Sequence, residues 1–211
     1  MKKKFLSLMM AAAVVATTSV SAFADDYSWS DKAEQDVKVN ITGDVENTEG
    51  NTVSGTLSVS IPTATTFTVG RNGTVTTAPI TVQNRGTQSV DVYAYKFVDQ
   101  TPNENSEITV VGAEKLKTAQ STAMLSLRLS GSSGKAYLKS EPSSSGNGVF
   151  KDDNCEERST GSGIKLISVS GNNSESITLI GETKSGDGVT APAKAVQDNF
   201  VLTLKIKKAQ S

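Results

Sequence analysis

The feature that most constrains the fold of this chain is an alternation of apolar and polar residues with a period of two. It is clearest in the closing segment, DNFVLTLKIKK. There the apolar positions are Phe200, Leu202, Leu204 and Ile206, and the positions between them are Val201, Thr203, Lys205 and Lys207. Successive side chains of a β-strand point to opposite faces, so this pattern predicts a strand with one apolar and one solvated face. We expect this strand at a sheet edge, where lysines deter further pairing.

Shorter runs of the same kind follow one another from Asp36 onward, separated by Gly, Asn, Ser and Thr. The strands they predict contain residues 37–41, 57–61, 67–69, 80–82, 89–98, 108–111, 125–129, 164–169, 177–180 and 200–207. The Asn72-Gly73 pair accepts positive φ and predicts a tight hairpin between residues 65 and 75. Only residues 113–122 favour a helix, and a short one. About nine or ten strands at this spacing are typical of an all-β antiparallel sandwich or jelly roll.

The first 24 residues have the pattern of a secretory signal peptide. Three lysines precede an apolar run over residues 5–15, and the segment ends in Ala22-Phe23-Ala24. The run is shorter than the roughly 20 residues that a bilayer crossing requires, so the alternative of a membrane anchor is disfavoured. We expect cleavage after Ala24 and a secreted, extracellular chain that does not stay in the membrane. A polar, flexible leader (residues 25–35) and a single β-sandwich domain (residues 36–211) should follow.

Between residues 131 and 163 the alternation stops in a stretch rich in Ser, Gly and charge. We expect this insertion to be a long surface excursion, in which Leu138 and Val149-Phe150 could pair as a small hairpin. The only cysteine, Cys155, lies here among acidic residues that disfavour the thiolate. We expect an exposed, unreactive thiol, with a bond between two chains as the alternative.

The same stretch holds the only candidate metal site. Calcium prefers oxygen ligands, and four carboxylates are close in sequence: Asp152, Asp153, Glu156 and Glu157. Their spacing is not that of a known calcium loop, so a solvated acidic loop is favoured.

Histidine is absent from the chain. Catalytic triads of the Ser-His-Asp or Cys-His kind and His-bearing zinc sites are therefore excluded. No pair of carboxylates lies among aromatic residues in the way that would suggest a tuned glycosidase acid. The basic residues are scattered rather than interleaved with aromatic ones, so we expect no nucleic-acid binding. We expect no enzymatic activity and no cofactor.

Residues 54–98 resemble secreted β-sandwich proteins of Gram-positive bacteria. A "SGTL" strand follows soon after the signal peptide, and an N-x-G turn, Asn84-Arg85-Gly86, leads into a long strand, as in the TasA and camelysin-like group. The threonine-rich, short-strand texture is similar to that of WxL-type surface proteins, but the Trp-x-Leu motif is missing and the one tryptophan is Trp29.

The TasA-like resemblance implies a jelly-roll subunit that assembles into extracellular fibres by lending an N-terminal strand to its neighbour. In this chain the segment placed to do so is residues 36–45, in which Val37, Val39 and Ile41 would fill a groove in the neighbour. The alternative is that this strand pairs within its own sheet.

The sequence thus favours a non-enzymatic structural or adhesive protein of a Gram-positive cell surface or matrix, with self-assembly as one version. Its partners would be other copies of itself or other surface proteins. The rival hypothesis is a carbohydrate-binding module for a cell-wall or host glycan, because sandwiches are a frequent scaffold for many functions. Tyr93 and Tyr95 stand two apart on one strand face and would form its aromatic platform.

Overall fold

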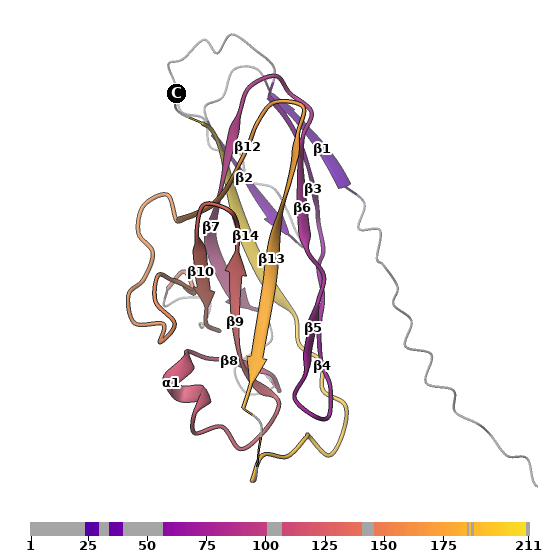
Figure 1. Cartoon of the computed structure of the whole chain (residues 1–211), viewed down its shortest axis with the longest axis vertical. Coiled ribbons are helices and arrows are strands. Elements are labelled where there is room, and N and C mark those ends of the chain that lie inside the picture. Colours follow the sequence, from indigo (N-terminus) through magenta and orange to yellow (C-terminus); the bar gives the residue numbers. More distant parts are fainter. Residues whose placement is uncertain are drawn as a thin grey trace, which may run out of the picture.

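The computed structural model describes residues 24–29, 34–39, 57–100, 107–140, 146–184, 186 and 188–209, and all statements below concern these residues. They are nearly all β (Figure 1). The larger sheet has the strand order β1-β3-β6-β13-β9-β10-β11, and β8 pairs with β9 beside this path. Its strands are β1 (Ala24–Trp29), β3 (Leu57–Pro62), β6 (Ile80–Asn84), β8 (Thr109–Val110), β9 (Met124–Ser130), β10 (Lys135–Leu138), β11 (Val149–Phe150) and β13 (Ser174–Thr183).

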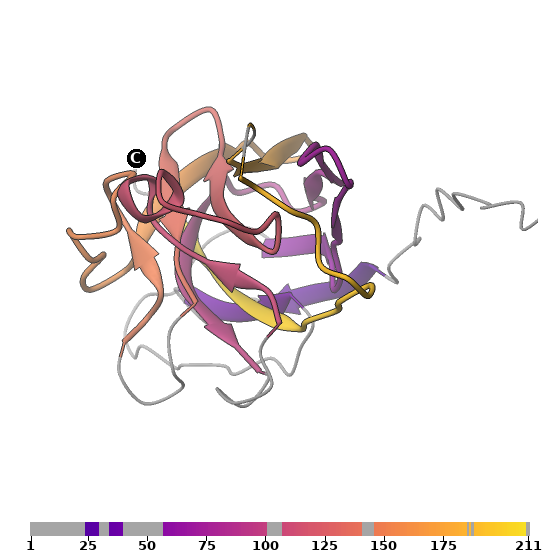
Figure 2. The ribbon, with the colours of Figure 1, turned by 90° about the horizontal axis from the view of Figure 1, so that it is seen from below.

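The smaller sheet has the order β12-β7-β14-β2. Its strands are β2 (Glu34–Val39), β7 (Val90–Asp99), β12 (Ile164–Val169) and β14 (Phe200–Lys208). A separate hairpin joins β4 (Phe67–Val69) to β5 (Val75–Thr77). Every strand pairing in the described residues is antiparallel except that of β8 with β9. Figure 2, which looks along the sandwich, shows the strands of the two sheets curling around a common interior.

The core lies between the two sheets and contains the apolar residues of the alternating runs. From the larger sheet it takes Leu57, Val59, Ile61, Ile80, Val82, Leu125, Leu127, Leu129, Ile177 and Leu179. From the smaller sheet it takes Val90, Val92, Ala94, Phe97, Leu166, Ile167, Val169, Leu202, Leu204 and Ile206. The expected all-β sandwich is therefore confirmed, and the period-two pattern follows the buried face of most of these strands. β12 is an exception, because a register shift between Lys165 and Ile167 leaves both Leu166 and Ile167 buried.

Two turns expected from the sequence are also present. In the β4–β5 hairpin, Gly73 has a φ of 82°, a conformation that residues with a Cβ rarely adopt. Between β6 and β7, the fully buried Asn84 holds the turn through both ends of its amide. Its Nδ2 donates to the carbonyl oxygens of Gln88 (2.7 Å) and Val169 (3.1 Å), and its Oδ1 accepts from the N–H of Gly86 (3.0 Å).

The closing strand differs from its expected place. β14 lies between β7 and β2, so it is an inner strand and not an edge. Its second face is also covered, since Thr203 and Lys205 are each only 5% exposed. The expectation of one solvated face is wrong because alternation reports which residues face the core, but not what covers the opposite face.

The stretch from 131 to 163 is more structured than a surface excursion. The expected hairpin forms, with Leu138 opposite Val149, and β10 extends the larger sheet by pairing with β9. Ala136, Leu138, Val149 and Phe150 are all buried. Cys155, expected to be exposed, is only 6% exposed, and its sulfur takes part in no disulfide bond within the chain.

The N-terminal segment and the helix also differ from their expected form. Residues 25–29 of the expected flexible leader belong to β1, which pairs with β3, and β2 begins at Glu34. The helix α1 (Ala113–Leu116) is a single turn, shorter than the expected 113–122. No helix among the described residues is both long and apolar enough to cross a bilayer.

Candidate functional site

The two N-terminal strands each add to an edge of a different sheet. β1 pairs with β3 over six positions, from Ala24 opposite Pro62 to Trp29 opposite Leu57. β2 pairs with β14, from Val39 opposite Leu202 to Glu34 opposite Lys207. Neither strand has a second strand partner within the described part of the chain. Both are therefore edge strands, held by main-chain pairing on one side.

The segment expected to act as a donor strand is thus partly seen. Val37 and Val39 are the register partners of Leu204 and Leu202, two residues of β14 that face the core. In this single chain they pair within their own sheet, which is the alternative to donation. Ile41 and the rest of residues 40–45 lie outside the described residues. The strand β2 therefore forms the edge of the smaller sheet, and it pairs there with the inner strand β14.

A polar cluster covers the outer face of the smaller sheet and is centred on Asp91, which is 7% exposed. Its carboxylate forms an ion pair with Lys165 (Nζ–Oδ1 2.8 Å) and accepts a hydrogen bond from the Ser168 hydroxyl (2.7 Å). The Tyr93 hydroxyl donates to the other carboxylate oxygen (3.4 Å). The cluster joins β7 to β12 on the side opposite the core, so it fastens an edge strand to the sheet.

Tyr93 and Tyr95 both lie on this outer face, as expected from the alternation. Lys205 Nζ lies 4.2 Å from the centre of the Tyr95 ring, and Lys207 Nζ lies 6.0 Å from that of Tyr93. Both distances are within the range of a cation–π contact. Burial and the Asp91 carboxylate raise the pKa of Tyr93 above its usual value, so the hydroxyl keeps its proton and donates to Asp91.

The two lysines limit how a sugar could stack on Tyr93 and Tyr95. A sugar stacks on the open face of an aromatic ring, and here an ammonium group lies over one face of each tyrosine. A glycan platform would have to use the opposite faces or displace the lysines. Glycan binding at Tyr93 and Tyr95 stays a prediction.

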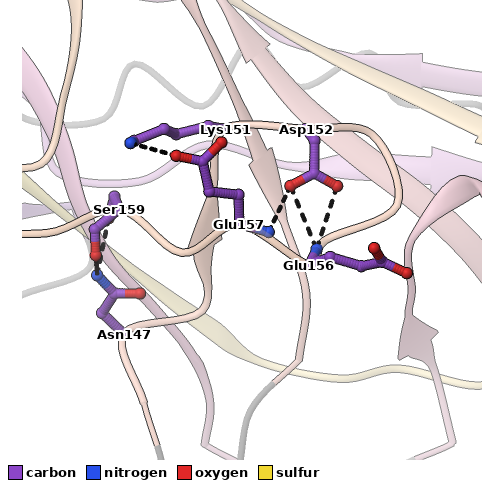
Figure 3. A network of polar contacts seen from close by, with 6 residues as sticks. All are labelled: Asn147, Lys151, Asp152, Glu156, Glu157 and Ser159. Atoms are coloured by element: carbon purple, nitrogen blue, oxygen red, sulfur yellow. Dashed lines mark hydrogen bonds and ion pairs between the residues drawn. The ribbon is translucent and has the colours of Figure 1, made fainter.

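Three of the four acidic residues expected as a weak calcium candidate, Asp152, Glu156 and Glu157, are drawn in Figure 3, and their carboxylates do not converge on one point. The Asp152 carboxylate accepts hydrogen bonds from the backbone N–H groups of Asn154 (3.1 Å), Glu156 (3.1 Å) and Glu157. Glu157 forms an ion pair with Lys151. The N–H groups of Glu157 and then Glu156 hold the pKa of Asp152 below its usual value. In the described part of the chain no group of three His, Cys, Asp or Glu residues is arranged to hold a metal ion.

The loop of residues 152–157, called the acidic loop below, also explains why Cys155 is buried. Asp152 holds the backbone of the loop, and Cys155 adopts a φ of 58° within it. The Cys155 thiol turns inward and donates to the carbonyl oxygen of Leu138 at 3.7 Å. A chain of contacts therefore runs from the acidic loop to the β10–β11 hairpin.

Sequence reasoning missed a pocket of about 490 Å³ at one end of the sandwich. One wall is β4 with the residues that follow it, Gly70 and Arg71, and the other is the segment from Ala191 to Gln197. Ile108 and Leu125 contribute to its floor. Its volume falls within the range typical of ligand sites. The one signal in the sequence is the stretch TAPAKAVQD, which interrupts the alternation just before the closing strand.

Comparison with known proteins adds no closer identification. No protein-family model, no curated protein and no solved structure matches this chain. The fold itself defines the class: an all-β protein of antiparallel sheets packed as a sandwich, with its two N-terminal strands at the sheet edges.

Proposed function

We propose that this chain is a secreted, non-enzymatic structural or adhesive protein of a Gram-positive cell surface or matrix. We further propose that it self-assembles by donating β2, which overlaps the expected donor segment of residues 36–45, to a neighbouring copy. The observation that carries this proposal is the place of β2. It is an edge strand, near the N-terminus, and it pairs with the inner strand β14 along six consecutive positions.

β2 of its own chain and β2 of a second copy are equivalent partners for β14. The hydrogen bonds that join β2 to β14 are main-chain bonds, so β2 of a second copy can form the same ladder. Exchange of an identical element costs little, because the hydrogen bonds that break within one chain form again between two chains. When each chain gives its strand to the next and the rotation does not close a ring, the result is a fibre.

β14 is suited to the receiving role. Its residues Leu202, Leu204 and Ile206 face the core, and its main chain is flanked by β7 on one side and β2 on the other. Departure of β2 would leave that second side of β14 unpaired. An unpaired strand edge over an apolar core is a strong template for another strand. Once its own β2 has left, β14 would therefore favour pairing with β2 of another copy.

The resemblance of residues 54–98 to the TasA and camelysin-like group supports the same function, as does the signal-peptide pattern of residues 1–24. We propose cleavage after Ala24, which is also the first residue of β1. An uncleaved signal peptide would run directly into the edge strand β1 and would tether the N-terminal strands, so cleavage would couple export to assembly.

The first test is sizing and negative-stain microscopy of the purified chain beginning at Asp25, together with hydrogen exchange of residues 36–45. The proposal predicts concentration-dependent oligomers or fibres. A strictly monomeric species at high concentration, with residues 36–45 protected from exchange, would contradict strand donation.

The carbohydrate-binding alternative has a separate test. Binding on a glycan array that is lost in a Tyr93→Ala/Tyr95→Ala variant would support it. Binding to no cell-wall or host glycan would remove it.

A further inference from the structure

The pocket at the end of the sandwich lies between two stretches of backbone that have hydrogen-bonding groups without a partner among the described residues. In the β4–β5 hairpin the hydrogen-bonded pairs include Gly70 with Thr74 (2.8 Å) and Thr66 with Ala78 (3.3 Å). Hydrogen-bonded and non-bonded pairs alternate along an antiparallel ladder. The N–H and C=O groups of Phe67 and Val69 therefore point away from β5, and both residues line the pocket.

The opposite wall has the same property. Residues 191–197 make no backbone hydrogen bond to any other part of the chain that the structure describes. The segment is nevertheless anchored at both ends. At one end Thr190 exchanges backbone hydrogen bonds with Gln120 and Thr122, and at the other the Asp198 carboxylate accepts from the N–H groups of Glu107 and Ile108.

These two walls lie on the same side of the molecule, at the end seen in Figure 2. Between them the floor is apolar, since Leu125 is fully buried and Phe67 packs against the core through Phe200 (ring centroids 6.0 Å apart). A groove with an apolar floor and a free strand edge matches an extended polypeptide better than a compact small molecule. Free N–H and C=O groups at every second residue are what an added strand binds.

The charge of the lining indicates the chemistry of the occupant. Among the described residues, Arg71 and Lys194 are the only charged ones in the lining, and both are exposed. The described lining therefore carries two cations and no carboxylate of its own, and the neighbouring Asp198 carboxylate is engaged by the N–H groups of Glu107 and Ile108. A bound segment with acidic side chains would meet complementary charge at the groove, which favours both encounter and register.

We infer that the groove between β4 and residues 191–197 is a docking site for an extended, acidic peptide segment of a partner protein, bound by main-chain pairing with β4. This site goes beyond the proposed strand donation, because no described residue of β2 or β14 lines it. Apolar side chains at alternate positions of the peptide would face the floor, and carboxylates would lie near Arg71 and Lys194.

The test uses three blocked synthetic heptapeptides, measured by fluorescence anisotropy against the chain beginning at Asp25. The first alternates valine and threonine and has glutamate at both ends. The second has lysine at both ends, and the third is the glutamate peptide with alternate backbone nitrogens methylated. The glutamate peptide should bind about tenfold more tightly than the lysine peptide, because of the charge of the lining. The methylated peptide should not bind.

Two variants locate the binding. Arg71→Glu/Lys194→Glu should reverse the order of the glutamate and lysine peptides, whereas Lys135→Glu, an exposed cation on β10 outside the lining, should leave the order unchanged. Ala195→Trp should fill the groove from an exposed position and abolish binding of every peptide. Circular dichroism confirms that each variant is folded.

Three results would overturn the inference. The first is that the glutamate peptide does not bind. The second is that its binding survives backbone methylation. The third is that the preference for the glutamate peptide over the lysine peptide is unchanged in Arg71→Glu/Lys194→Glu. Self-association of the chain that Arg71→Glu/Lys194→Glu abolishes would assign the groove to a second copy instead. Strand donation by β2 has its own readout, since fibres should persist in the Ala195→Trp variant whether or not the peptides bind.

Discussion

Asp91 is the buried carboxylate that fastens β12 to the smaller sheet. It accepts a hydrogen bond from Ser168 and another from Tyr93, and it pairs with Lys165. The Lys165 side chain is 39% exposed, so solvent screens part of the ion pair. The carboxylate itself is enclosed, and removal of its charge would leave several donors with a weaker acceptor.

We predict that Asp91→Asn lowers the free energy of unfolding by about 1–3 kcal/mol, because the buried donors that face the carboxylate are left with a weaker, neutral acceptor. Urea denaturation measures the change. The matched control is Glu182→Gln, which removes a 60% exposed carboxylate lying 3.6 Å from Arg128. It should change stability by less than about 0.5 kcal/mol. Equal effects of the two substitutions would mean that the Asp91 cluster does not stabilise the sheet.

Asp152 acts on the acidic loop through backbone N–H groups, and its effect depends on pH. Its pKa in the folded chain is lower than in the unfolded chain. The stabilisation is therefore fully present above the unfolded pKa, and it is lost as the pH falls through the folded value.

We predict that part of the acid sensitivity of the protein disappears in Asp152→Asn. Unfolding free energies measured from neutral pH down to below pH 3.8, the ordinary value for this carboxyl, should fall less steeply in the variant than in the wild type. Asp153→Asn is the control, since that side chain accepts no hydrogen bond from another described residue. Parallel curves for Asp152→Asn and the wild type would contradict the assignment.

The β10–β11 hairpin is part of the core and also forms one end of the larger sheet. Leu138 is fully enclosed, its carbonyl accepts from Cys155, and it stands opposite Leu127 on β9. The hairpin therefore links the acidic loop to the main sheet, and its stability should be shared with the rest of the domain.

We predict that Leu138→Ala costs about 2–5 kcal/mol, the range for deleting a buried leucine side chain. Leu116→Ala, the same substitution at a half-buried position of α1, should cost clearly less. Thermal or urea unfolding compares the two. If Leu138→Ala costs no more than Leu116→Ala, the stretch from 131 to 163 is a surface excursion after all.

The same elements show what the sequence could and could not predict. Alternation located most of the strands and their buried faces, because side-chain direction in a strand is a local property. It did not predict β1, which lies in a polar stretch. It did not place β14 inside the sheet, because strand neighbours are set by contacts far apart in sequence. Lys205 illustrates this limit. From the sequence a lysine is expected to be solvated, but in the folded chain Lys205 is only 5% exposed because neighbouring residues cover it. The groove between β4 and residues 191–197 was missed for the same reason, because its two walls lie more than a hundred positions apart along the chain.

Each of the two sheets has at one edge a strand from the N-terminal part of the chain. β1 extends the larger sheet, and β2 covers the free side of β14 in the smaller one. An edge strand joined to the fold through one ladder is the part of a sandwich most readily exchanged between copies. This arrangement is the basis of the proposed assembly.

Strand donation can be tested by locking β2 onto its own chain. Lys38 and Thr203 are register partners, and the Cα atoms of such partners are about 4.5–5.5 Å apart, a separation that a disulfide spans. Lys38→Cys/Thr203→Cys is made in a Cys155→Ala background, and Cys155→Ala alone is the control. Sizing and microscopy should find the oxidised double-cysteine variant monomeric, and reduction should restore the assemblies formed by the control. If the oxidised variant, with its intrachain disulfide verified by mass spectrometry, forms the same assemblies, then strand donation by β2 does not hold the copies together.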